Sequence, residues 1–262
     1  MTRAVVLRRT VRGREHTIEP GPPRPQPILS AIVCKTNAEL IERIAPLWLP
    51  DHLPVVDFTY GKGNFWKRYR PTDLIGHDLY AGPCCDGVDY LSAESLARAH
   101  PNGVAVGVFD APYVSKGGDK TSTIPDFNAA YGLHTFDKRT PDVILSGIVT
   151  GLINMHPLLD RYRLERRRVR KDRITGEPII DYVPARGGWL LVKCMDYISG
   201  GSVVEAERLI LNAAEEIGYE RLDRFVHVSG PGPQPTVNPD GSPRRQVHSR
   251  SNYSTLLILG KV

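Results

Sequence analysis

Residues 53–66 read LPVVDFTYGKGNFW, and this stretch decides the fold. Its apolar start ends in Asp57, and a turn that holds Gly61 and Gly63 follows at once. A short apolar run bounded by a turn is typical of a strand that is buried on both faces of a sheet. Two glycines one residue apart let the backbone turn tightly and pass close to a ligand. The pair is neither a complete GxGxxG motif nor a P-loop, because a Phe-Trp pair follows it.

The same pattern, an apolar run that ends in an acid, recurs twice downstream. Residues 73–78 (DLIGHD) end in Asp78, and residues 104–110 (VAVGVFD) end in Asp110. Further apolar runs predict strands, and apolar residues at helical spacing predict helices. We expect these further strands at 87–91, 188–196, 224–229 and 254–261, and helices at 36–48, 92–100, 140–155 and 203–218.

Strands that alternate with helices predict an α/β fold in which helices cover both faces of a mostly parallel sheet. Ligands of such sheets bind beyond the carboxyl ends of the strands. We therefore expect Asp57, Asp78 and Asp110 to face one shared crevice. A carboxylate in the position of Asp78 can accept hydrogen bonds from the ribose hydroxyls of a nucleotide-like cofactor.

The composition is that of an intracellular globular protein. Hydrophobic residues make up 41% of the 262 residues, which is enough for a sizeable core. No apolar run reaches the roughly 18 residues of a membrane span, and the first residues do not form a secretory signal. We therefore expect a cytoplasmic protein with no membrane partner. The four cysteines form no CxxC pair, and we expect neither a disulfide framework nor a metal site.

Residues 1–29 differ from the rest of the chain because they are rich in basic residues and proline. They close with EPGPPRPQP (19–27). Proline removes a backbone donor and fixes φ, so such a stretch is a poor core element. We predict a flexible arm over 1–29 and a single domain over 30–262.

Four stretches together resemble the amino-methyltransferases. Asp110-Ala111-Pro112-Tyr113 resembles their (D/N/S)-P-P-(Y/F) motif, and DFTYGKGNFW (57–66) resembles their first motif, especially in phage and bacterial DNA methylases. GWLLVKCMD (188–196) and NYSTLLILGK (252–261) resemble their later sheet strands. The resemblance covers roughly residues 30–262.

This resemblance implies a Rossmann-like class I methyltransferase fold, with a mostly parallel seven-stranded sheet whose last strand is antiparallel. It also implies S-adenosylmethionine as cofactor and DNA as partner, in a bacterial or phage-infected cell, as in restriction-modification. The cofactor residues that it implies lie in the first motif, at the end of the second predicted strand and about 11 residues further on: Asp57, Thr59, Gly61, Gly63, Phe65, Asp78 and Asp89.

The implied catalytic residues are those of the tetrapeptide that starts at Asp110. The N6 amine of adenine is a weak nucleophile because its lone pair is delocalised into the ring. The Asp110 carboxylate and a main-chain carbonyl near Ala111 and Pro112 would accept its two N–H groups, while Tyr113 would stack on the extruded base. Ala111 stands where the family has proline, so this turn is less rigid. An acid at position 110 favours adenine N6 over cytosine N4 as a family tendency.

A basic segment at about 155–186 is the candidate for target recognition. Its centre, RYRLERRRVRKDR (161–173), holds eight basic residues against two acids. Polyanions attract such clusters by counterion release. The other interpretation of the run is a solvated face. The residues expected to contact DNA are Arg161, Arg163, Arg166, Arg167, Arg168, Arg170, Lys171 and Arg173.

Several other functions remain open from the sequence. Within the same enzyme class these are cytosine N4 methylation and methylation of an RNA or a protein amino group. A nicotinamide-dependent dehydrogenase shares the fold signals but explains neither residues 110–113 nor the arginines. A catalytically inactive, methyltransferase-like DNA-binding protein also fits, because of Ala111. Both a monomer and a homodimer are open, as are the recognition sequence and a partner nuclease.

Overall fold

A computed structural model of the chain describes residues 5–11, 14–18, 30–34, 36–51, 53–78, 86–111, 141–160, 164–171, 178–199, 202–228, 242 and 253–261. Its centre is a seven-stranded mixed sheet in which six strands are parallel and β13 is antiparallel to both neighbours. The strand order is β3 (Ile32–Cys34), β12 (Tyr219–Val228), β13 (Tyr253–Lys261), β9 (Trp189–Cys194), β6 (Val106–Phe109), β4 (Val55–Asp57) and β5 (Leu74–Gly76). The expected mostly parallel α/β sheet is confirmed.

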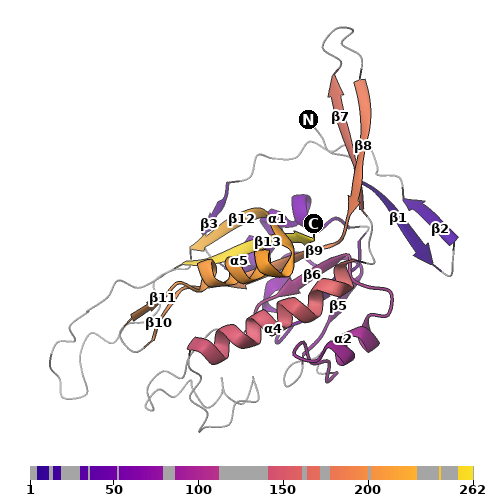
Figure 1. Cartoon of the computed structure of the whole chain (residues 1–262). Helices are drawn as coiled ribbons and strands as arrows, with labels where there is room; N and C mark the ends of the chain where they lie inside the picture. Colours follow the sequence, from indigo (N-terminus) through magenta and orange to yellow (C-terminus); the bar gives the residue numbers. More distant parts are fainter. Residues whose placement is uncertain are drawn as a thin grey trace.

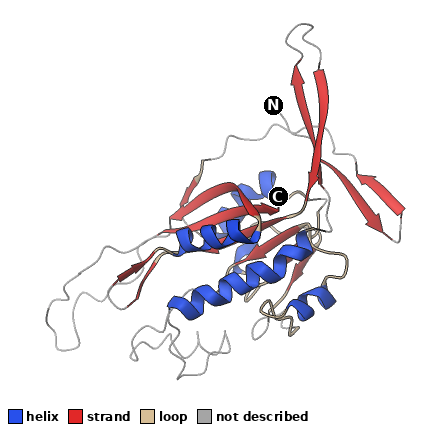
Figure 2. Ribbon diagram, in the orientation of Figure 1, coloured by secondary structure: helices blue, strands red, loops and turns tan. Residues whose placement is uncertain are grey.

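Four α-helices cover the sheet within the described ranges. They are α1 (Asn37–Trp48), α2 (Ala93–Ala99), α4 (Pro141–Leu159) and α5 (Ala206–Ile217). Figure 1 and Figure 2 show α2, α4 and α5 on one side of the sheet and α1 on the other. A short 3-10 helix, η1 (Asn64–Trp66), follows β4 and packs against α1.

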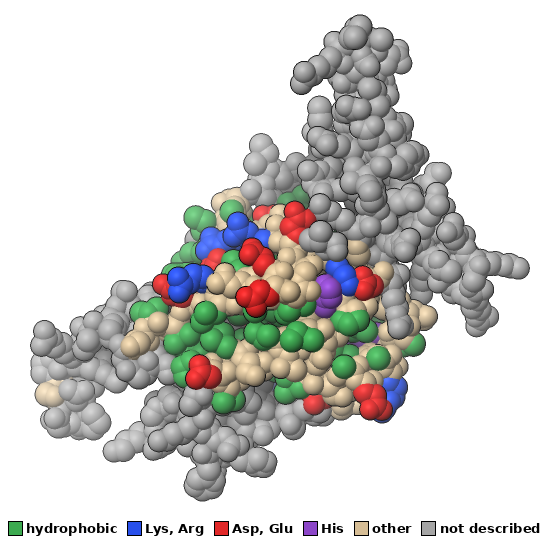
Figure 3. Space-filling view, viewed as in Figure 1, with side chains coloured by type: hydrophobic (Ala, Val, Ile, Leu, Met, Phe, Trp, Pro, Cys, Tyr) green, Lys and Arg blue, Asp and Glu red, His purple; other side chains and the backbone are tan. Residues whose placement is uncertain are grey.

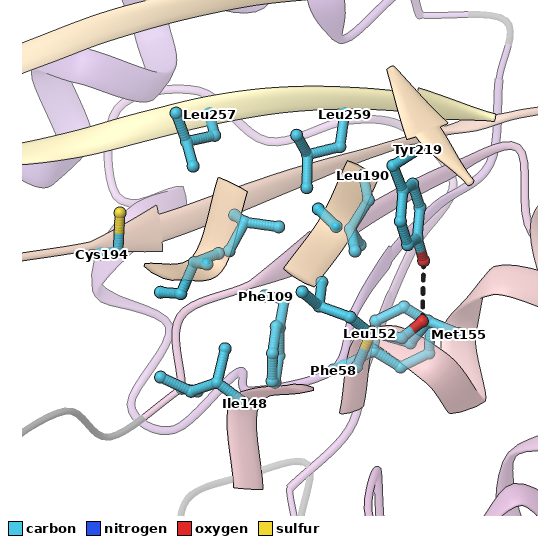
Figure 4. Packing of buried hydrophobic residues seen from close by; sticks show 14 of the residues in the cluster. Phe58, Phe109, Ile148, Leu152, Met155, Leu190, Cys194, Tyr219, Leu257 and Leu259 are labelled. Atoms are coloured by element: carbon cyan, nitrogen blue, oxygen red, sulfur yellow. Dashed lines mark hydrogen bonds between the residues drawn. The ribbon is translucent and has the colours of Figure 1, made fainter. Parts of the chain in front are cut away.

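The alternation of side chains along each strand builds two cores. Leu256 and Ile258 of β13 pack on the side of α1 and η1. Leu257 and Leu259 of the same strand pack with α2, α4 and α5. Figure 4 shows this second cluster, in which the Tyr219 hydroxyl donates a hydrogen bond of 2.9 Å to the carbonyl of Leu152. Both faces of the sheet are thus buried, as continuous apolar strands require.

The helix boundaries follow from local capping chemistry. Thr36 caps α1, and its hydroxyl accepts from the Glu39 backbone while the Glu39 carboxylate accepts from the Thr36 backbone. Gly218 ends α5 in the left-handed conformation, with φ 106°. The helix α4, which was expected over 140–155, continues past Pro157 to Leu159. A proline this close to the end of a helix removes only one hydrogen bond of the last turns.

A second, four-stranded antiparallel sheet lies beside the first, in the order β2-β1-β7-β8. It is made of β1 (Val5–Val11), β2 (Arg14–Ile18), β7 (Leu164–Lys171) and β8 (Pro178–Arg186). The β7–β8 pair extends away from the seven-stranded sheet in Figure 1. A short ribbon of β10 (Tyr197–Ser199) and β11 (Ser202–Val204) precedes α5.

The sequence-based expectations of local structure are wrong at three further places. Residues 7–11 pair with residues 14–18 in the hairpin β1–β2, and residues 5–7 pair with β7, whereas a flexible arm was predicted over 1–29. The division of the chain at residue 29 stays a prediction. Residues 87–91 form no strand, and β3, which was not predicted, is the seventh strand instead. The α5 helix starts at Ala206 rather than at Val203, since Val203 pairs within β10–β11.

The helix α4 meets the length and apolarity of a membrane span, with 39% of that window buried. Core helices of soluble proteins pass the same test. The Ile144, Ile148 and Leu152 side chains belong to the second core, whereas Val143 and Ile153 are exposed. Figure 3 shows hydrophobic side chains in a band across the middle of the visible face, where Figure 1 draws α4 and α5.

Candidate functional site

The candidate site lies where three adjacent parallel strands end. In the register of the sheet, Asp57 at the end of β4 pairs with Gly76 of β5 and with Val108 of β6. Asp78 and Asp110 follow two residues after those partners. The three acids therefore sit at the same carboxyl edge of the sheet, as the sequence predicted.

The Asp57 carboxylate is almost fully enclosed, with 3% of the residue exposed. Trp66 donates its indole N–H to Asp57 Oδ2 at 2.7 Å, and the Thr59 backbone N–H donates to Oδ1 at 3.0 Å. Burial raises the pKa of Asp57 from 3.8 to about 7, although both donors oppose that rise. The charge of Asp110 raises it further. Asp57 fixes the turn after β4 through these two donors.

Thr59 connects the first acid to the third. Its hydroxyl accepts a hydrogen bond of 2.7 Å from the backbone N–H of Asp110, and it lies 3.4 Å from Asp57 Oδ1 as a donor. One side chain thus holds the ends of β4 and β6 together. These two contacts explain why a threonine occupies position 59, and the sequence alone does not predict them.

The turn that contains the two glycines connects the first strand to the second acid. The Gly61 N–H donates to Asp78 Oδ2 at 2.9 Å, and Gly61 has φ 52°. Gly63 has φ 66°, and a Cβ there would lie 2.8 Å from the Tyr60 hydroxyl. Residues that carry a Cβ atom are strained in this left-handed conformation, which glycine adopts freely. The turn therefore holds bare backbone next to the Asp78 carboxylate.

Asp110 stands immediately after β6 and has a buried cation as its neighbour. Lys193 Nζ lies 3.8 Å from Asp110 Oδ1, and the lysine side chain is only 5% exposed. The Asp110 side chain as a whole is 28% exposed, but its Oδ1 is buried and has no hydrogen-bond partner in the described part of the chain. Burial raises the pKa of the Asp110 carboxyl, and the Lys193 ammonium opposes that rise. This oxygen is an acceptor without a donor.

Phe65 and Ala111, two further predicted site residues, are buried beside these acids. Phe65 lies in η1 at 6% exposure, and its ring centroid is 5.9 Å from Lys193 Nζ. Ala111 follows Asp110 and is 3% exposed. Phe65 therefore lies beside Lys193 and also belongs to the core around α1.

The remaining predicted residues are less closely tied to the three acids. Asp89 lies in the turn before α2, where its carboxylate accepts from the Leu91 N–H at 2.8 Å and its own N–H donates to Ser95. No described contact joins Asp89 to the other acids. Arg166, Arg167, Arg168, Arg170 and Lys171 lie on β7. Outside the described residues lie Pro112, Tyr113, Arg161, Arg163 and Arg173.

A buried pair of histidines adjoins the site and was not predicted. His77 Nε2 lies 2.8 Å from His100 Nε2, and His77 Nδ1 lies 2.5 Å from Asp86 Oδ2. Burial and the neighbouring His77 lower the pKa of His100 to about 4. His77 precedes Asp78, and its backbone carbonyl accepts from the Tyr60 N–H at 2.9 Å. The pair thus supports the base of the glycine turn.

The sequence also gave no role to Trp66 or Lys193. The signal for Lys193 is a lysine inside the otherwise apolar run GWLLVKCMD (188–196). Trp66 has no such signal, because an apolar residue after a turn is ordinary. Among the described residues, no group of three or more His, Cys, Asp or Glu side chains is arranged to hold a metal ion.

Comparison of the chain with protein-family models, with curated proteins and with solved structures found no match.

Proposed function

We propose that this protein is an S-adenosylmethionine-dependent DNA methyltransferase of the Rossmann-like class I fold that methylates the N6 amine of adenine. The observation that carries the proposal is the buried Oδ1 of Asp110, an acceptor without a donor at the carboxyl edge of the sheet. Unpaired buried acceptors are costly, and they cluster at functional sites. The Asp110 side chain is 28% exposed, so an incoming amine would donate an N–H to the accessible part of this carboxylate.

The residues around the turn suit the cofactor. The backbone at Gly61 and Gly63 leaves room for close approach, and the Asp78 carboxylate is oriented by the Gly61 N–H. Asp78 would accept from the ribose hydroxyls. Phe65, which is buried beside Lys193, would pack near the bound cofactor.

When bound, S-adenosylmethionine supplies the methyl group: a bond forms from the amine nitrogen to the methyl carbon, the carbon–sulfur bond breaks with its electron pair on sulfur, and the amine's extra proton passes to water. The chain's own contribution is to hold the amine. The Asp110 carboxylate would accept one N–H and so orient the nitrogen lone pair. Tyr113 would stack on the extruded base.

The β7–β8 ribbon supports DNA as the substrate. Beyond Arg166, the last residue of β7 that pairs with β1, β7 and β8 form a two-stranded antiparallel ribbon, which has the dimensions that enter a major groove. Strand β7 holds five basic residues, three of which, Arg166, Arg168 and Arg170, occupy alternate positions. Alternate positions of a strand share one face. We expect this ribbon to contact phosphates and base edges.

Substitution of Asp110 by alanine tests the proposal. We expect methyl transfer to DNA to fall by about a hundredfold or more, while the Kd for S-adenosylmethionine, measured by calorimetry, changes little. Base-modification sequencing of DNA from cells that express the wild-type chain reports the base, the atom and the site. Full activity of the variant, or an unmodified genome together with no cofactor binding, would contradict the proposal.

A further inference from the structure

Lys193 occupies a position in the sheet where a charge needs an explanation. β6 and β9 are parallel, their last pair is Phe109 with Val192, and Asp110 and Lys193 come next on each strand. Every residue of β9 is buried, and all except Lys193 are apolar or cysteine. An isolated charge is expensive in such surroundings, so an ammonium here requires a partner.

The distance between Lys193 and Asp110 shows what kind of contact the two groups make. The separation of 3.8 Å between Lys193 Nζ and Asp110 Oδ1 is an ion pair but is too long for a hydrogen bond. The ammonium therefore acts on the charge of the carboxylate, and the exposed part of the Asp110 side chain, 28% of it, remains accessible to another donor. Of the described titratable groups, Asp57 from β4 and Lys193 from β9 face Asp110. The two groups act in opposite directions, because Asp57 disfavours a second negative charge.

We propose that Lys193 is a positioning residue that favours the ionised form of Asp110, so that the carboxylate can accept a hydrogen bond from the substrate amine. The role in catalysis rests on the proposed function. A protonated Asp110 would offer an O–H donor where the amine needs an acceptor. Removal of Lys193 would take away the cation that opposes the effect of burial on the pKa of Asp110, and it would therefore favour the protonated carboxyl.

The first readout does not depend on activity. Nuclear magnetic resonance of protein labelled with ¹³C at the aspartate carboxyls follows the titration of Asp110, with Asp110→Asn for assignment. We expect Lys193→Met to raise the titration midpoint by one pH unit or more, a tenfold rise in proton affinity. For Lys193→Arg we expect a midpoint of the Asp110 titration within about half a pH unit of wild type, because arginine keeps a positive charge at this position. An unchanged midpoint in Lys193→Met overturns the inference.

The control is another paired lysine of the same sheet. Lys261 ends β13 at the amino end of β9 and forms an ion pair with Asp160. Lys261→Met should leave the Asp110 midpoint unchanged. If Lys193→Met unfolds at pH 7 but folds at a lower pH at which its own titration shows Asp110 to be protonated, the pairing is supported. Loss of folding at both values would show a purely structural role and overturn the inference.

The second readout separates this inference from the proposed function. In a methyl-transfer assay, Lys193→Met should move the acid limb of the kcat profile upward and lower kcat at pH 7 about tenfold. The KM for DNA and the Kd for S-adenosylmethionine should stay within about threefold, and Lys193→Arg should restore the profile. If wild type transfers no methyl group, the proposed function fails, yet the titration still decides whether Lys193 sets the ionisation of Asp110.

Discussion

Asp57 shows how a single buried carboxyl makes the fold sensitive to pH. Its pKa of about 7 lies above the value of 3.8 for an exposed aspartate, so the folded state binds the proton more tightly than the unfolded chain does. The stabilisation from this group is complete below about pH 4 and is lost as the pH rises through about 7. Acid, within this range, therefore favours the folded state at this position.

Substitution of Asp57 by asparagine should remove this dependence. We expect the stability difference between wild type and variant to fall by about 2 to 4 kcal/mol between pH 4 and pH 8. Urea denaturation at several pH values within that range measures it. Parallel pH profiles for the two proteins would show that Asp57 does not carry the raised pKa.

At the scale of single residues, the sequence predicted where the three acids lie, but it did not predict which side chains contact them. Asp57, Asp78 and Asp110 each end a recognisable apolar run, and parallel strands bring such ends to one edge. Trp66 and Lys193 reach the site through packing between elements that are distant in the sequence. Short-range patterns contain no information on such contacts.

Among the elements, the turn between β4 and η1 depends most on its glycines. Gly63 caps η1 in the left-handed region, and a Cβ there would lie 2.8 Å from the Tyr60 hydroxyl. We expect Gly63→Ala to destabilise the protein by about 1 to 3 kcal/mol, because strain and a steric clash add. Thermal and urea unfolding measure this change.

A matched control for this substitution lies in α4. A Cβ at Gly147 would meet nothing within 4 Å, and the helix favours alanine over glycine. Gly147→Ala should therefore be neutral or stabilising by up to about 1 kcal/mol. Equal losses in Gly63→Ala and Gly147→Ala would mean that the turn conformation is not the cause.

The elements themselves were predictable where their signals are local. The capping box of Thr36 and Glu39 located α1, and long apolar runs located β6, β9 and β13. Residues 87–91 misled because a short apolar stretch also occurs in turns, where Asp89 bonds its own backbone neighbours. The strand β3 is only three residues long and pairs with β12, far along the sequence.

On the scale of the whole molecule, the β7–β8 ribbon is expected to make the affinity for DNA depend on salt. Substitution of Arg166, Arg168 and Arg170 by glutamine removes three potential phosphate contacts, each worth about 0.9 in the slope of log K against log salt. We expect the slope to fall by about 2 to 3 in a titration of duplex DNA. The control is the pair Arg98→Gln and Arg208→Gln, which removes two exposed helix arginines.

An unchanged slope in the ribbon variant, or an equal loss in the control, would place DNA binding elsewhere on the molecule. The sequence predicted the position of this basic segment but not its form. A charge run favours a solvated helix as readily as a strand, and only pairing with β8 and β1 decides between them.

The central place of β13 has a consequence for how the sheet folds. This strand, residues 253–261, inserts between β9 and β12, which both precede it in the sequence. Until β13 pairs with both strands, β9 and β12 each present an edge whose backbone groups lack this partner. The two halves of the sheet therefore join through pairing between residues far apart in the sequence, which makes this a slow step of folding.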